Sequence, residues 1–128
     1  TMGGQGLAPG DVADLEAYLA TLQPPPEVAI DEVVALPGRT VFEGKAACAT
    51  CHAGSQFTDR VLRAAAPGDL VATPSLRGLR ATPPYLHDGS ARSVRDVLGA
   101  RAALPAHRVE GVLEPAEFES LVKYVEAL

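Results

Sequence analysis

The sequence predicts an all-α fold in which a few helices are joined by long loops. Two observations predict it: apolar residues recur with helical spacing near both ends of the chain, and no βαβ pattern is visible. A first helix is expected to begin at Asp11 and to gather its apolar side chains on one face, namely Val12, Leu15, Tyr18, Leu19 and Leu22. A last helix is expected from Pro115 to Leu128, because proline is favoured at the first helical position.

The remaining elements are predicted between these two helices. The run Gln23–Pro26 should end the first helix and form an extended spacer, and the apolar residues of 27–37 could pack as an extended strap. A second helix is predicted to start near Pro37–Gly38 and to run into a cysteine-containing motif. Residues 53–92 are dense in Gly, Pro and Thr and predict loops, and a short helix is expected at 93–100.

Composition argues against several classes of function. The chain has 128 residues and is 47% hydrophobic, which suits one domain with a core, although tryptophan is absent. Its formal net charge is −5 and it has no basic stripe, so nucleic acid is not expected as a partner. No run of about 20 apolar residues suggests a membrane span. The start, Thr1–Gly4, has no features of a signal peptide and is expected to be mid-chain sequence of a trimmed protein.

The two cysteines of the chain lie three residues apart and a histidine follows the second. Cys48, Cys51 and His52 form the Cys-x-x-Cys-His order that is typical of covalent haem c attachment. Two thiols on one turn can add to the two vinyl groups on one edge of a porphyrin, and the adjoining imidazole can then bind the iron. The motif predicts one covalent haem c with its iron. Because this attachment is made outside the cytoplasm, it also predicts a periplasmic or otherwise exported protein.

Three other interpretations of the cysteine pair are weaker. A thioredoxin-like dithiol would need a βαβ pattern nearby. A zinc site needs four ligands, and the chain has a single Cys-x-x-Cys and three histidines that are not spaced as a pair. A disulfide that closes so short a loop would restrain little of the unfolded chain.

Beyond this motif, residues 38–128 resemble the C-terminal haem domain of the bacterial dihaem cytochrome c peroxidase and MauG-like family. The resemblance is carried by the cysteine motif together with three blocks, Phe57–Asp59, Thr73–Leu79 and Pro84–Ser90. It implies a cytochrome c fold, in which the first and last helices cross beside a haem in a loop-lined cleft. Gly44 would then allow the close crossing, with Tyr124 as its bulky neighbour.

The resemblance also implies roles for single residues. His52 would be the proximal iron ligand, and a backbone carbonyl near Pro74 would accept the second N–H of its imidazole. Arg77 would pair with a haem propionate, with a solvated surface arginine as the alternative. Phe57 and Leu76 would wall the haem or belong to the ordinary core. Tyr85, in the third block, is a further candidate haem-binding residue.

The sixth iron ligand is where the sequence departs from the family pattern. The family places a methionine or a tyrosine at what is here Arg101, and arginine cannot bind iron because it has no acceptor. The only methionine is Met2, which would belong to an absent domain. His107, in a proline-flanked loop, is the favoured metal ligand. An open site, His87, Tyr85 or a lysine remain the alternatives.

An internal similarity suggests the domain organisation. Residues 7–22 align with 113–128 at an offset of 106, and five positions are identical. The identical pairs are Leu7/Leu113, Pro9/Pro115, Leu15/Leu121, Tyr18/Tyr124 and Leu22/Leu128. We expect 1–22 to be the C-terminal helix of a truncated upstream domain, itself cytochrome c-like, 23–36 a proline-rich linker and 37–128 the haem domain. Chance similarity between two amphipathic helices is the alternative.

The expected function is electron transfer by the haem, as a relay domain of a larger multi-haem redox protein with redox-protein partners. No catalytic residue is identified. The alternative is a peroxidase that reduces hydrogen peroxide, which needs an open distal position and an acid/base group such as Glu110 or Glu114. A haem sensor that binds a small gas is a third possibility.

Overall fold

The computed structural model describes residues 6–23, 32–66, 68–99, 101–102 and 104–128. Its elements in chain order are α1 (Pro9–Thr21), α2 (Glu32–Glu43), the 3₁₀ turn η1 (Cys48–Thr50), β1 (Leu62–Ala66), β2 (Asp69–Ala72), η2 (Leu79–Ala81), α3 (Val94–Leu98), η3 (Pro105–His107) and α4 (Pro115–Glu126). The predicted all-α class is correct for the helices, including the short helix expected near 93–100. It is wrong for residues 62–72, which form an antiparallel hairpin. The fold is therefore mostly helical with one small hairpin.

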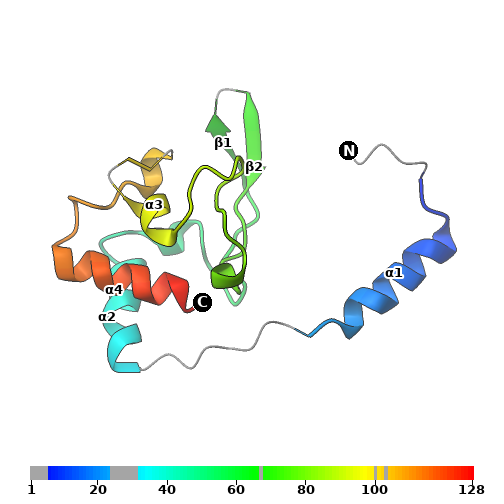
Figure 1. Ribbon diagram of the computed structural model, residues 1–128, viewed down its shortest axis with the longest axis horizontal. Helices are drawn as coiled ribbons and strands as arrows, with labels where there is room; N and C mark the ends of the chain where they lie inside the picture. The colour runs from blue at the N-terminus through cyan, green and yellow to red at the C-terminus, as the bar shows by residue number, and fades with distance from the viewer. Residues whose placement is uncertain (1–5, 24–31, 67, 100, 103) are drawn as a thin grey trace.

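Helices α2 and α4 cross, and α3 lies beside α4 (Figure 1). Helix α4 supplies much of the core, since Leu121 is fully buried and Phe118, Val122 and Val125 are nearly so. Its start is fixed by Pro115 in the first turn and by the Glu117 carboxylate, which accepts the Glu114 backbone N–H at 2.9 Å. The sequence prediction for this helix start is confirmed.

Gly38 makes the close approach of the two helices possible. A Cβ built at Gly38 would overlap the Ser120 carbonyl oxygen and would lie 2.5 Å from Tyr124 Cβ. The rings of Phe42 and Tyr124 then pack edge to face, with centroids 5.4 Å apart. The sequence prediction placed Gly44 at this crossing and is wrong, because a Cβ at Gly44 would meet only the Thr40 carbonyl one turn earlier in the chain.

Helix α2 begins at Glu32, five residues before the start predicted at Pro37. Pro37 lies inside the helix on an exposed face, and as a proline it has no backbone N–H to donate to the preceding turn. Part of the segment expected as linker and strap, 32–36, is therefore helical. The other predicted strap residues, Val28 and Ile30, lie outside the described residues.

The hairpin β1–β2 is tied to the segment before it by one arginine. Arg63 donates to both carboxylate oxygens of Asp59, at 2.9 and 2.7 Å, and to Thr73 Oγ1 at 2.6 Å. Leu62 pairs with Ala72, and Ala64 with Leu70, so these four side chains share one exposed face. Arg63 thereby links the two ends of the hairpin, which lead to the cysteine–histidine motif on one side and to the Thr73–Leu79 block on the other.

Helix α1 lies apart from the other elements (Figure 1), and none of its residues is buried. Its apolar side chains from Val12 to Leu22 are between 41% and 61% exposed, whereas the matching positions of α4 lie in the core. None of the helices in the described ranges combines the length and apolar character that a bilayer span requires.

Replacing Gly38 with alanine should lower the free energy of unfolding by about 1–3 kcal/mol, because the added methyl group cannot fit between α2 and the Ser120–Tyr124 turn. Urea denaturation followed by circular dichroism measures the change. Gly10→Ala is the matched control, since a Cβ there meets nothing within 4 Å. Equal unfolding midpoints for the two variants would show that the crossing is not as close as described.

Candidate functional site

The cysteine–histidine motif forms a tight turn directly after α2. Ala47 adopts a left-handed conformation (φ 51°) and starts the turn η1, and the N–H groups of Cys51 and His52 both donate to the Cys48 carbonyl. Both thiols are free and half-buried. The turn therefore holds the two sulfurs and the imidazole on one short, hydrogen-bonded segment.

The state of the Cys48 thiol argues against a redox dithiol. Burial raises the pKa of Cys48 to about 11, whereas a reactive dithiol needs a lowered pKa and an electropositive environment. The only sheet among the described residues is the antiparallel hairpin, so no βαβ unit surrounds the motif there. Within the same residues no group of three or more His, Cys, Asp and Glu side chains is placed to hold a metal ion.

The imidazole of His52 is oriented by a backbone carbonyl. Its Nδ1 lies 3.1 Å from the carbonyl oxygen of Phe57, which can only accept, so the hydrogen bond requires the tautomer protonated at Nδ1. The Pro74 carbonyl interacts with the same ring more weakly. Burial lowers the pKa of His52 and so favours the neutral ring. Nε2 therefore keeps a free lone pair for a metal, with the second-sphere hydrogen bond that metal-bound histidines usually have.

Phe57 and Arg77, two of the other predicted haem-binding residues, lie near this ring, and a third, Leu76, lies in the core. Phe57 (φ 49°) packs edge to face against Phe42, with centroids 6.2 Å apart, and Leu76 is buried in the core. Arg77 is exposed, donates from Nε to the Ser55 carbonyl at 2.9 Å, and lies 5.8 Å from the Phe57 ring centroid. Arg77 thus braces the loop that follows His52, and its predicted pairing with a propionate stays a prediction.

His107 lies opposite His52 although 55 residues separate them in the chain. It ends the turn η3, and its ring centroid is 6.4 Å from that of His52, with ring planes inclined by 32°. Burial lowers the pKa of His107, and the facing His52 lowers it further, so this imidazole too is held neutral. Its Nδ1 is buried, and within the described part of the chain it has no hydrogen-bond partner.

The separation of the two rings suits a metal ion between them. An ion bound through one nitrogen of each imidazole, with metal–nitrogen bonds of about 2 Å, places the centroids about 6 Å apart. The two cysteines lie on the turn that leads into His52, and Phe57 packs against the core cluster that contains Leu76. This donor set fits an iron porphyrin tethered through Cys48 and Cys51.

A pocket of about 480 Å³ borders His52 on the side of the helix crossing. It is lined by Arg39, Phe42, Glu43, Ala49, His52, Ala53, Gly54, Phe57 and Tyr124. Neither His107 nor Cys48 lines it, so it is a surface hollow beside the histidine pair rather than the space between the rings. His52 therefore lines the same pocket as the α2 residues Arg39, Phe42 and Glu43.

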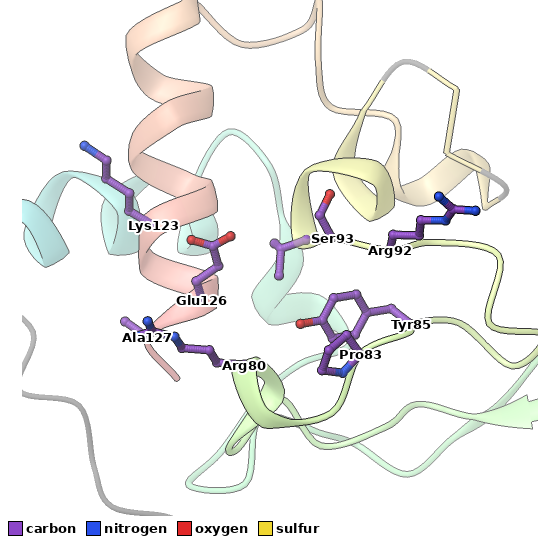
Figure 2. Close-up of a pocket in the computed structure, with 9 residues that line it drawn as sticks. Arg80, Pro83, Tyr85, Arg92, Ser93, Lys123, Glu126 and Ala127 are labelled. Carbon is purple, nitrogen blue, oxygen red and sulfur yellow. The ribbon is translucent and has the colours of Figure 1, made fainter.

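Tyr85 is placed differently from the other candidates. It lines a second pocket of about 440 Å³ between α4 and the segments around η2 and α3, and no residue of this pocket lines the one at His52. Figure 2 shows the Tyr85 ring and the Glu126 carboxylate facing this pocket, with Lys123 and Arg92 at its rim. Burial and the nearby Glu126 raise the pKa of Tyr85, so it stays a neutral phenol.

Two features of the site were missed by the sequence analysis. The acceptor closest to His52 is Phe57, whereas a carbonyl near Pro74 was expected, and the Asp59–Arg63 clamp was not foreseen. The Phe57–Asp59 block was recognised as a motif, but its role depends on a backbone carbonyl that side-chain chemistry cannot reveal. Of the alternative sixth ligands, His87 is exposed, and so is Arg101, which stands at the position of the family's own ligand.

The fold is also found in a solved structure of another protein. A chain of hydrazine synthase from Kuenenia stuttgartiensis, in a structure determined under xenon pressure, superposes with a TM-score of 0.74 and 22% sequence identity. The superposition covers 94% of this chain and 56% of the other. At this level of identity the comparison establishes the fold.

In sequence, the chain is similar to the methylamine utilization protein MauG of Methylorubrum extorquens. The two are 40% identical over 80 aligned residues, which cover 48% of this chain and 23% of MauG. The likeness to MauG predicted from the sequence motifs is thus confirmed. No protein-family model matches the chain. The chain spans about a quarter of this relative and just over half of the solved structure.

Proposed function

We propose that this chain is a c-type haem domain that transfers electrons. Cys48 and Cys51 would carry the thioether bonds, and His52 and His107 would bind the iron from its two sides. The observation that carries the proposal is the pair of neutral imidazoles with centroids 6.4 Å apart, one of them directly following the cysteine turn. When bound, the haem supplies a one-electron iron couple, whose potential the axial ligands set within a range of about 0.8 V.

The residues of the chain have separate tasks in this proposal. The hydrogen bond from His52 Nδ1 to the Phe57 carbonyl fixes the orientation of the proximal ring and raises its basicity. Burial keeps both imidazoles uncharged, so no proton has to leave before they bind. Phe57 and Leu76 would limit access of water to the proximal side, which reduces the reorganisation that accompanies a change of charge.

A relay is favoured over the peroxidase alternative by the second histidine. A peroxidase needs an open iron position and an acid/base group close to it. His107 would fill that position, and the two carboxylates considered as acid/base groups, Glu110 and Glu114, are exposed.

The chain would be one part of a larger, exported protein. Helices α1 and α4 start alike, because in each the carboxylate of the third helical residue accepts the backbone N–H of the N-cap residue. Asp11 accepts from Ala8 at 3.0 Å, and Glu117 accepts from Glu114 at 2.9 Å. The apolar face that α4 buries is exposed on α1. These similarities support the proposal that residues 1–22 close an upstream haem domain. A periplasmic location follows from the covalent haem.

Expression with the haem c maturation machinery should give a protein heavier than the polypeptide by one haem, with a low-spin absorption spectrum in both oxidation states. Mass spectrometry and absorption spectroscopy provide the measurements. The Cys48→Ala/Cys51→Ala double variant is the control, because any haem it binds should be extracted by denaturing solvent. If the parent protein has only the mass of the polypeptide, the proposed function is wrong.

Replacing His107 with alanine should convert the low-spin ferric spectrum to a high-spin one, because the iron loses its second strong-field imidazole. His87→Ala is the matched control: this histidine is exposed, and its loss should leave the spectrum unchanged. A His107→Ala variant that remains low-spin would exclude His107 as the axial ligand.

The net charge of −5 supports a partner with a basic docking patch. Reduction by a basic cytochrome should slow several-fold as salt shortens the Debye length from about 30 Å at 0.01 M to about 8 Å at 0.15 M. Stopped-flow absorbance measures the rate, with an uncharged small reductant as the control. A rate independent of ionic strength would contradict this partner.

A further inference from the structure

The two facing histidines differ in what holds their rings. His52 is bonded through Nδ1 to the Phe57 carbonyl, and it adjoins two cysteines that would be joined to the same porphyrin. The ring of His107 makes no hydrogen bond within the residues that the structure describes, although its Nδ1 is buried. Whichever nitrogen of His107 meets the iron, the other has no acceptor from the described chain.

This difference bears directly on the strength of the two iron–nitrogen bonds. An acceptor on the second ring nitrogen makes the imidazole a stronger donor and fixes its rotation, and loss of such a partner typically weakens metal binding about 10–100-fold. The backbone of His107 is well held, since its N–H donates to Leu104 and its carbonyl accepts from the buried Val109. The ring can therefore leave the iron by rotation about side-chain bonds, without unfolding of the segment.

We propose that His107 is an exchangeable iron ligand, an inference that rests on the proposed function. When His107 leaves, the ferrous iron would bind a small uncharged molecule such as carbon monoxide at the position that His107 occupied. One iron–nitrogen bond breaks and one bond to the carbon of the incoming molecule forms, while the imidazole departs as a neutral base. No electron or proton is transferred in the exchange. His52 stays bound, because its acceptor and the two thioether bonds hold it in place.

An uncharged ligand suits the surroundings of the ring. His107 is half-buried, and no cationic side chain has a described contact with its ring, so an entering anion would lose hydration without gaining a partner. The negative charge of the whole chain adds to this penalty. Diatomic ligands of low polarity avoid it.

Stopped-flow mixing of the ferrous, haem-loaded protein with carbon monoxide tests the proposal. We expect the spectrum of a carbon monoxide complex to appear at a rate that levels off with increasing concentration, because departure of His107 limits it. His107→Ala should instead react at a rate linear in concentration and at least about tenfold faster. His87→Ala, the control, should behave as the parent protein does.

The outcomes separate this proposal from the proposed function. A low-spin ferrous spectrum that carbon monoxide leaves unchanged would overturn the exchange while the relay stands. A rate linear in concentration and unaffected by His107→Ala would overturn it as well, since the position would then be open. Should the variant fail to fold, the concentration dependence of the parent protein alone decides. Absence of bound haem would contradict the proposed function itself.

Discussion

The close crossing of α2 and α4 is the constraint on which the rest of the site depends. Gly38 brings the helix backbone against the Ser120 carbonyl, and this contact fixes the direction in which α2 ends. Backbone hydrogen bonds then carry the chain without a break from Thr40 and Val41 through Gly44 to the cysteine turn. The position of His52 is thus set by a helix packing contact more than a dozen residues earlier in the chain.

The two histidines illustrate how packing prepares donor atoms. Burial disfavours the charged form of both imidazoles, and the facing His52 adds to this effect at His107. A carbonyl beside one ring adds direction to this effect, since it selects one tautomer. Nearby, the carboxylate of Asp59 is neutralised by Arg63, whose hydrogen bonds hold the pKa of Asp59 well below its ordinary value. The site therefore keeps its charged groups paired at its edge.

The sequence allowed the local parts of this structure to be predicted, and the non-local parts only by resemblance. The cysteine turn and the start of α4 follow from short patterns with a direct physical meaning. Gly38 was missed because Pro37 suggested that the helix starts there, so the side of α2 that faces α4 could not be assigned. The choice matters because Gly38 and Gly44 point about 120° apart around a helix. The hairpin was missed because its strands are rich in alanine, although Pro67–Gly68 is a turn signal. No local pattern brings His107 to His52, since that proximity depends on the whole path from 53 to 107.

The burial of Cys48 affects how readily the two free thiols can be oxidised to a disulfide. Disulfide formation proceeds through the thiolate, and a pKa of about 11 leaves very little thiolate at neutral pH. In the folded polypeptide, attack by the Cys48 sulfur would therefore be slow. Folding would thus slow one route to a disulfide that would compete with the proposed attachment of haem to these two sulfurs.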